Sequence, residues 1–189
     1  MLTASRHENV LDANDAVVVV VDLQEAFREP IFEFDKIVAR TAVVVQAAKL
    51  LNVPVLVTEQ YPQKLGATVP EIKSALPEGV AIVDKTAFSC CGASVFMEQL
   101  DRLRRKQVLL CGIETHVCMS QTAHDLLARG RQVHVLEDCT SSRAPANREV
   151  GLAKMRRSGA LPSSSEMALF ELMVDSKHEH FRAISKMVK

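Results

Sequence analysis

The chain has 189 residues, 23 Lys plus Arg, 23 Asp plus Glu and a formal net charge of +0. This length suits one domain of ordinary size, and 48% hydrophobic residues can form a buried core without disulfides or a structural metal, which excludes a disordered chain. The balanced charge offers no attraction for nucleic acid or an anionic membrane, so we expect neither as a partner.

The N-terminal segment and the cysteines bear on the compartment. Segment 1–15 carries Glu8, Asp12 and Asp15 and lacks the apolar stretch of a signal peptide. The longest apolar run, 16–21, is far shorter than the roughly 20 residues that cross a bilayer. The 5 cysteines form no regular disulfide framework. We therefore expect a cytoplasmic protein with reduced thiols, with a mitochondrial location as the alternative.

The first half of the chain begins with the run AVVVVVD at 16–22, which lacks polar alternation and predicts a strand covered on both faces. Apolar residues near helical spacing predict an amphipathic helix over 35–51. A short strand is expected at 53–58, and the Pro and Gly residues of 59–70 predict a loop. A third strand is expected at 80–84.

The second half continues the alternation of strands with helices. In chain order we expect a turn at 89–92, a helix at 93–105, a strand at 108–111, a helix at 116–129, a strand at 132–137 and helices at 146–157 and 166–174. Gly130 and Gly159 follow helix ends, and Pro145 stands at a first-turn position. Ser163 and Glu166 match a capping box for the helix at 166–174. A last amphipathic helix ends the chain.

This order of elements predicts an α/β fold with a doubly wound, mainly parallel sheet of about six strands and helices on both faces. No repeat or change of composition divides the chain, so we expect residues 1–189 to form a single domain. Ligands of such sheets bind beyond the carboxyl ends of the strands, where the strand order reverses. Reactive side chains are therefore expected at the strand ends.

Three reactive side chains follow predicted strand ends: Asp22, Lys85 and Cys118. We expect Cys118 in the first turn of a helix capped by Thr115, where the helix dipole favours a thiolate. Lys85 is expected to lower the pKa of this thiol further, and Asp22 to accept its proton. Backbone N–H groups at the same helix start would stabilise an oxyanion.

Each of these residues also has a purely structural interpretation. A cysteine near a strand end is commonly a small buried apolar group, an aspartate there caps a turn, and a lysine is commonly a solvated charge. The joint placement of the three favours the chemical interpretation. The remaining cysteines are assigned to packing: Cys90, Cys91, Cys111 and Cys139.

Metal and cofactor motifs are missing from the sequence. The 6 histidines show no spacing specific for zinc, and neither the dinucleotide-binding nor the Walker glycine pattern occurs, so we expect no metal and no cofactor. His178 and His180 are expected at the surface. With Tyr 1 and Trp 0, the chain is also poorly supplied for stacking nucleic-acid bases.

Several runs resemble the isochorismatase-like cysteine hydrolases: VVDLQ at 20–24, DKTAFS at 84–89 and CGIETHVC at 111–118. Others resemble the eukaryotic isochorismatase domain-containing subgroup: VTEQYP at 57–62, DLLARG at 125–130 and MRRSGA at 155–160. The resemblance covers nearly the whole chain and implies a Rossmann-like, three-layer fold.

The resemblance also implies a catalytic triad. In it Asp22 is the general base, Lys85 its charged partner and Cys118 the nucleophile. A cis peptide bond is implied between Ile113 and Glu114, and the backbone N–H groups of Glu114 and Cys118 are implied as the oxyanion hole.

Differences between this chain and other members of the family limit the range of expected substrates. Enzymes that hydrolyse isochorismate resemble this chain but lack the nucleophilic cysteine, so Cys118 disfavours that reaction. Metal-dependent nicotinamidases carry an Asp and His cluster in the loop where this chain has no His, at 59–64. Glu114 stands where amidase relatives often have a small residue, which disfavours an anionic substrate. We expect specificity to depend on loop 59–69, and the expected substrate-binding residues are Gln24, Gln60, Tyr61, Phe88, Thr115 and His116.

The resulting hypothesis is a cofactor-free cysteine hydrolase that acts on a small carboxamide or related acyl compound through a thioester. A catalytically idle scaffold of the same fold is the alternative, and a role in nucleic-acid processing is less favoured. We also expect a homo-oligomer, a dimer or higher, because members of the family commonly assemble.

Overall fold

The computed structural model describes residues 6–189 and contains one sheet of six parallel strands, in the order β3-β2-β1-β4-β5-β6. The strands are β1 (Ala16–Val21), β2 (Val55–Gln60), β3 (Ile82–Lys85), β4 (Gln107–Gly112), β5 (Gln132–Thr140) and β6 (Leu161–Ser163). The predicted doubly wound α/β fold is confirmed. The first five residues of segment 1–15, for which we expect no signal peptide, lie outside the described part.

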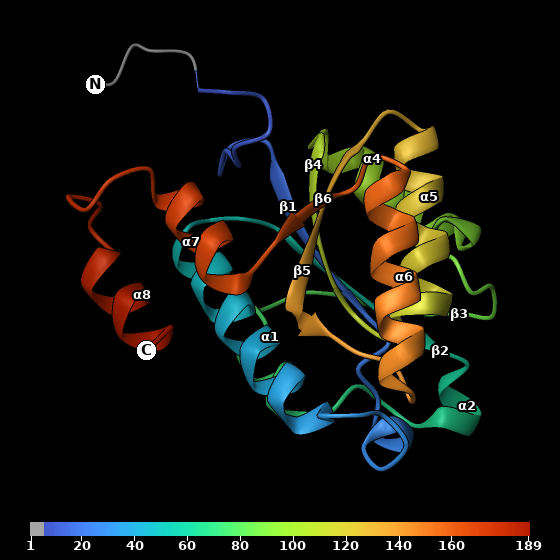
Figure 1. Cartoon of the computed structure of the whole chain (residues 1–189). Coiled ribbons are helices and arrows are strands. Elements are labelled where there is room, and N and C mark those ends of the chain that lie inside the picture. Colours follow the sequence, from blue (N-terminus) through green and yellow to red (C-terminus); the bar gives the residue numbers. More distant parts are fainter. Residues whose placement is uncertain (1–5) are drawn as a thin grey trace.

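Helices cover both faces of the sheet and make a three-layer molecule (Figure 1). One layer holds α1 (Phe34–Leu50), α3 (Pro70–Ala75), α7 (Ser165–Met173) and α8 (Phe181–Met187), and the other holds α4 (Ser94–Leu103), α5 (Ser120–Ala128) and α6 (Pro145–Arg157). Four short helices follow strand ends: η1 (Glu25–Phe27), α2 (Pro62–Leu65), η2 (Cys90–Gly92) and η3 (Thr115–Met119). Across residues 6–189, no helix combines the length and the apolar character needed to span a bilayer.

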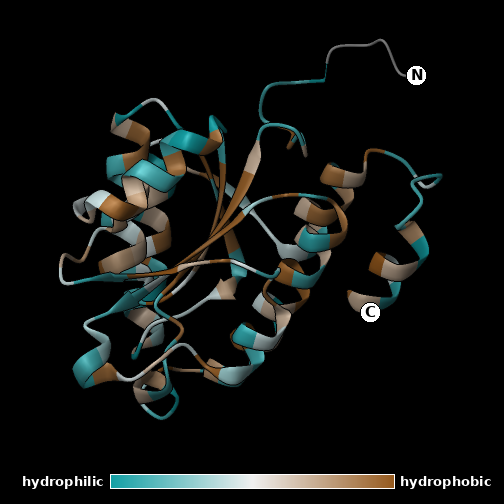
Figure 2. Ribbon diagram, turned by 180° about the vertical axis from the view of Figure 1, so that it is seen from behind, coloured by the Kyte–Doolittle hydropathy of each residue, from teal (hydrophilic) through white to brown (hydrophobic). Residues whose placement is uncertain are grey.

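The central strand β1 shows why its sequence lacks polar alternation. Ala16, Val18 and Val20 pack in the core under α1. The alternate residues Val17, Val19 and Val21 pack in the core under α4 and α5. All six residues of β1 are buried because helices lie on both faces of the sheet. Figure 2 shows this as hydrophobic strands between helices of mixed hydrophobic and hydrophilic residues.

The prediction of a loop over 59–70 is wrong at both ends of that range. Glu59 and Gln60 belong to β2, and α2 follows at once with Pro62 in its first turn. Pro70 likewise lies in the first turn of α3. The N–H groups of the first helical turn have no partner within the helix. A proline, which has no N–H group, therefore loses no hydrogen bond there and can begin a helix.

The predicted capping box at Ser163 is also wrong. Ser163 lies in the edge strand β6, opposite Leu136, and Ser164 caps α7 by accepting a hydrogen bond from the backbone N–H of Met167 at 3.2 Å. A three-residue edge strand that contains Pro162 carries little periodicity, and only its pairing with β5 identifies it.

The strand order places a crevice beside β1. From β1 the chain winds outward through β2 and β3, then crosses the sheet to β4 on the other side of β1. The carboxyl ends of β1 and β4 therefore flank the point at which the winding reverses, where open α/β sheets bind ligands. Asp22 and segment 113–118 emerge at this point.

Candidate active site

Asp22 turns the chain sharply at the end of β1. Its φ of 54° lies in the left-handed region, which aspartate adopts more readily than a β-branched residue. Its backbone N–H donates to the carbonyl of Thr58 on β2 at 3.1 Å, and the residue is 1% exposed. The carboxylate is thus held inside the sheet edge.

Lys85, the last residue of β3, forms a buried ion pair with this carboxylate. Its Nζ lies 2.7 Å from Asp22 Oδ2, and the two side chains are 0% and 2% exposed. Burial opposes the charge on Lys85 and is the largest single effect, but the charge and hydrogen bond of Asp22 together with the two nearby thiols outweigh it, so the pKa of Lys85 is raised. Because a buried ion is tolerated only beside its counter-ion, each member of the pair requires the other.

Cys118 reaches the pair because β4 ends close against β1. The backbone N–H of Ile113 donates to the carbonyl of Val21 at 2.9 Å. Gly112 has a φ of 119°, and a Cβ atom there would lie 2.1 Å from the carbonyl oxygen of Val21. Only glycine permits this approach, which directs the following segment toward Asp22.

The segment after Gly112 contains a cis peptide bond between Ile113 and Glu114. The backbone N–H groups of Val117 and Met119 both donate to the carbonyl of Glu114, at 3.0 and 3.2 Å, which defines the wide turn of η3. Within residues 6–189, the N–H of Glu114 itself meets no acceptor. It is therefore available to a bound group near Cys118.

Thr115 does not cap the nucleophile helix, contrary to the prediction. Glu114 is the residue that precedes η3, and the Thr115 side chain is buried and points to the neighbouring loop. Its Oγ1 donates to the carbonyl of Ser141 at 2.9 Å and lies 3.0 Å from Thr140 Oγ1. These contacts fasten the start of η3 to the end of β5.

The predicted lowering of the pKa of Cys118 is wrong. Burial, followed by the negative charge of Asp22, raises the pKa of the thiol from its ordinary 9.0 to about 12, and the positive charge of Lys85 offsets only part of this rise. Hydrogen bonding to Asp22 also favours the protonated form. The resting protein thus holds a neutral thiol beside a carboxylate, and the thiolate forms only when that proton leaves.

Two contributors to the site, Thr58 and Cys90, were missed by reasoning from the sequence. Thr58 on β2 donates from Oγ1 to Asp22 Oδ1 at 2.7 Å. Cys90 in η2 is buried in the core, as predicted, but its Sγ also lies 3.6 Å from Thr58 Oγ1. The one signal in the sequence is the polar Thr58 near the carboxyl end of a strand beside that of Asp22.

Gln24 and Gln60 lie at the site edge, where they hold the protein together. Gln24 is fully buried, and its side-chain amide donates to the carbonyls of Gln60 and Gly66, at 3.0 and 2.6 Å. Gln60 Oε1 accepts from Lys85 Nζ at 2.6 Å. Both amides are therefore already engaged by protein groups.

Tyr61, Phe88 and His116 offer surface that a substrate could contact. Tyr61 and Phe88 are 42% and 55% exposed and follow β2 and β3, the strands beside Asp22 and Lys85. His116 is half-buried in η3, with Nδ1 3.0 Å from Ser142 Oγ.

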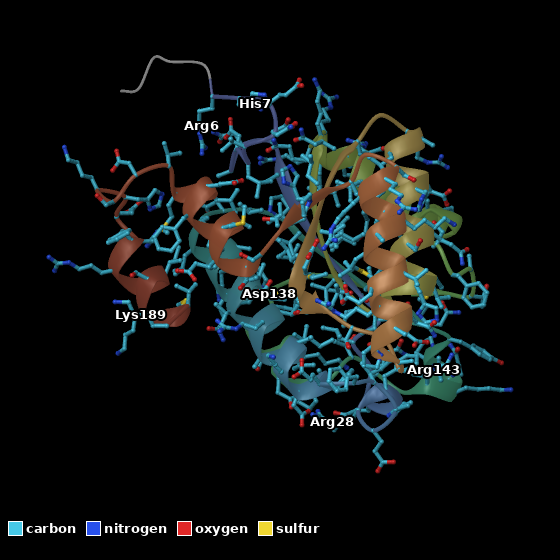
Figure 3. The ribbon with its side chains drawn as sticks, viewed as in Figure 1. Arg6, His7, Arg28, Asp138, Arg143 and Lys189 are labelled. Carbon is cyan, nitrogen blue, oxygen red and sulfur yellow. The ribbon has the colours of Figure 1, made fainter. Side chains whose placement is uncertain are left out.

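Glu114 carries a charge beside the nucleophile, and Arg143 pairs with it. Glu114 Oε2 accepts from the backbone N–H and from Nε of Arg143, at 3.0 and 3.2 Å. The Glu114 side chain is 11% exposed, whereas that of Arg143 is 63% exposed. Figure 3 labels Arg143 near the start of α6, on the side where the strands end. The pairing weakens the electrostatic argument against an anionic substrate.

The other titratable groups do not extend the site. Among residues 6–189 no three His, Cys, Asp or Glu side chains gather in a group that could hold a metal ion. All five cysteines are free thiols; Cys111 and Cys139 lie in the core under α1, and Cys91 is half-buried.

This chain is similar to known proteins in both sequence and structure. The family model of the isochorismatase domain matches residues 16–167. Isochorismatase domain-containing protein 2A of Mus musculus is 46% identical over 175 residues, which are 92% of this chain and 82% of the mouse protein. The MAR1 ribonuclease of Caenorhabditis elegans has a TM-score of 0.91 and 38% identity over 95% of this chain and 92% of that one. YcaC from Pseudomonas aeruginosa, with hexane-2,5-diol and covalent acrylamide, has a TM-score of 0.89 and 26% identity over 97% and 93%.

Proposed function

Because this chain belongs to the isochorismatase family of hydrolases, we propose that it is a cofactor-free cysteine hydrolase of small carboxamides or related acyl compounds. The observation that carries the proposal is the buried Asp22–Lys85 pair, 2.7 Å apart, beside the thiol of Cys118. A thiol, a base and a fixed cation form the set that nucleophilic acyl transfer requires.

In the proposed reaction, Asp22 takes the proton of Cys118, and the thiolate attacks the carbonyl carbon of the bound amide. The backbone N–H groups of Glu114 and Cys118 stabilise the oxyanion. Asp22 then gives the proton to the departing amine as the C–N bond breaks and a thioester forms. A water molecule, deprotonated by Asp22, attacks the thioester, and the returning proton restores the Cys118 thiol. Lys85 balances the charge of Asp22 throughout.

An acyl substrate fits this site better than isochorismate. Isochorismate is a vinyl ether and has no acyl carbon at the bond that is cleaved. It therefore has no acyl group to transfer to a thiol nucleophile. The Pseudomonas YcaC structure contains covalent acrylamide, itself a small amide, which supports a covalent reaction in a related protein. Tyr61, Phe88 and His116 are the proposed substrate contacts, whereas Gln24 and Thr115 act through the fold.

The test is a panel of neutral, cationic and anionic small amides, with release of amine as the readout. The Cys118→Ala variant is expected to lose hydrolysis completely, whereas the matched Cys91→Ala variant keeps it. An acyl adduct on Cys118, detected by mass spectrometry during turnover, would support the thioester. If the wild-type protein hydrolyses none of the amides and forms no adduct, the idle-scaffold alternative replaces the proposal.

RNA is a second candidate substrate because the nematode relative is named a ribonuclease. The net charge of +0 gives little general attraction to a polyanion. The panel therefore includes single-stranded RNA at low salt. Cleavage that persists in Cys118→Ala would separate such an activity from the cysteine chemistry.

We also propose that residues 1–189 act as one cytoplasmic domain that assembles into a homo-oligomer. Phe32 and Met167 are 48% and 52% exposed and line a cavity of about 730 Å³ between α1, α6 and α7. Exposed apolar side chains around a cavity are typical of protein interfaces. Light scattering of the purified protein tests this, and a monomer at all concentrations would contradict it.

A further inference from the structure

The carboxyl end of β2 lies between the two members of the catalytic pair. In the sheet, β2 is flanked by β1, which leads to Asp22, and by β3, which ends at Lys85. Thr58 and Gln60 are two residues apart, so their side chains leave β2 on the same face. Each of them meets one member of the pair.

Thr58 holds the carboxylate on the side that Lys85 leaves free. Lys85 Nζ donates to Asp22 Oδ2 at 2.7 Å, and Thr58 Oγ1 donates to Asp22 Oδ1, also at 2.7 Å. Since Asp22 N–H donates to the carbonyl of Thr58, the two residues are joined through both main chain and side chain. The carboxylate therefore has no freedom to rotate away from Cys118.

The Thr58 hydroxyl that donates to Asp22 also contacts the thiol of Cys90. A hydroxyl has one hydrogen, and a carboxylate only accepts, so the hydrogen of Thr58 is committed to Asp22. In the 3.6 Å contact between Cys90 Sγ and Thr58 Oγ1, the thiol must then be the donor. The result is a directed chain from the Cys90 S–H through Thr58 to the carboxylate.

Gln60 fixes the position of the Lys85 ammonium, as Thr58 fixes that of the Asp22 carboxylate. Its Nε2 donates to the carbonyl of Thr86 at 2.8 Å, which orients the amide so that Oε1 faces Lys85 Nζ at 2.6 Å. Lys85 also donates to the carbonyl of Phe88 at 3.1 Å. With the carbonyl of Ala87 at 3.3 Å, the ammonium hydrogens are shared between Asp22 and three other oxygens.

From these contacts we propose that Thr58, supported by Cys90, and Gln60 are positioning residues that set the proton affinity of the Asp22–Lys85 pair. The inference rests on the proposed function, because it concerns the base that deprotonates Cys118. The titratable groups that face Asp22 are Lys85 at the end of β3, Cys90 in η2 and Cys118 in η3. Thr58 adds to them an uncharged donor that stabilises the ionised carboxylate.

The test measures alkylation of Cys118 by iodoacetamide as a function of pH, so it does not need a substrate. Thr58→Val removes the hydroxyl at nearly constant volume, and loss of a donor to a carboxylate is expected to raise the acidic midpoint of alkylation by about one pH unit. Thr58→Ser keeps the hydroxyl and is expected to keep the wild-type midpoint. Gln60→Met is expected to shift the midpoint as well, because Lys85 loses the shortest of its contacts with uncharged acceptors.

Thr41→Val is the matched control. Thr41 in α1 is equally buried, but its side chain lies beside Cys111 and Cys139 in the core under α1, and not beside Asp22. Its midpoint is expected to equal that of the wild type. If Cys118 alkylates with the same midpoint in Thr58→Val and in the wild type, the positioning role is wrong while the proposed function stands. If Cys118 of the wild type reacts no faster than the other thiols at any pH, the proposed function itself fails.

Discussion

Two groups of buried thiols occupy different regions of the same sheet. Cys118 and Cys90 lie at the carboxyl edge of the sheet beside Asp22 and Lys85. Cys111 and Cys139 lie in the core under α1. Burial is the main cause that raises the pKa of Cys118 and of Cys111, in each case to about 12. The pKa of the thiol therefore does not distinguish the proposed nucleophile Cys118 from the packing residue Cys111.

The difference between the regions lies in what surrounds the sulfur. Cys111 donates to the carbonyl of Val19 at 3.4 Å, a group that cannot take its proton. Cys118 has a carboxylate that can take its proton and an ammonium that balances the remaining charge. Cys139 also donates to a carboxylate, that of Asp138, at 3.6 Å, so the proposed reactivity of Cys118 requires a base and a cation together. Four predictions test this contrast.

The largest expected effect is loss of the buried cation. Lys85→Met leaves Asp22 as an unpaired buried charge and is expected to lower the free energy of unfolding by about 3–5 kcal/mol. The control is Lys36→Met, since Lys36 pairs with Glu33 at 3.2 Å on the surface. That control is expected to change stability by less than about 0.5 kcal/mol. Urea denaturation measures both, and equal losses would contradict the importance of burial.

The next effect is the selectivity of alkylation. At neutral pH, iodoacetamide is expected to modify Cys118 at least roughly a hundredfold faster than Cys111, because Cys111 is sealed in the core and donates to a backbone carbonyl. Half-buried Cys91 is the internal reference for access without a neighbouring base. Peptide mass spectrometry gives all the rates. A Cys118 rate that merely follows that of Cys91 at every pH would remove the distinction between the two regions.

The packing thiols are expected to affect stability at alkaline pH. Burial raises the pKa of Cys111 from 9.0 to about 12, so above pH 9 the unfolded thiol ionises while the folded one keeps its proton. The unfolded state then binds fewer protons, and the free energy of unfolding falls as pH rises. Between pH 9 and 10 the unfolded thiol goes from half to mostly ionised, so Cys111→Ala is expected to reduce this fall by about 1 kcal/mol. Denaturation between pH 9 and 10 tests it; an unchanged slope would contradict the prediction.

The smallest expected effect concerns the packing of α6 on η3. A Cβ atom on Gly151 would lie 2.9 Å from the backbone of Thr115 and of His116. Gly151→Ala is therefore expected to shift η3 and reduce amide hydrolysis about tenfold. Alanine favours the helix by up to roughly 1 kcal/mol, so stability should change little. Val150→Ala, at a neighbouring position that is 66% exposed, is the control. Equal activity of the two variants would show that η3 tolerates displacement.

The sequence by itself determined the order of elements and the residues that end the strands. The uninterrupted apolar run of β1 predicts a strand covered on both faces, and parallel strands bring their carboxyl ends to one edge. Asp22, Lys85 and Cys118 could therefore be placed together before any contact was known. The short edge strand β6 and the helices that begin at Pro62 and Pro70 escaped prediction because their local patterns are weak.

Only the tertiary structure decided how the site is tuned. The role of Thr58, the orientation of Gln60 toward Lys85 and the pairing of Glu114 with Arg143 depend on contacts between residues far apart in the chain. The direction of the pKa shift of Cys118 likewise depends on its burial. Helix position and a nearby lysine predict a lower pKa, but desolvation and the charge of Asp22 outweigh them, because both act through space in a medium that excludes water.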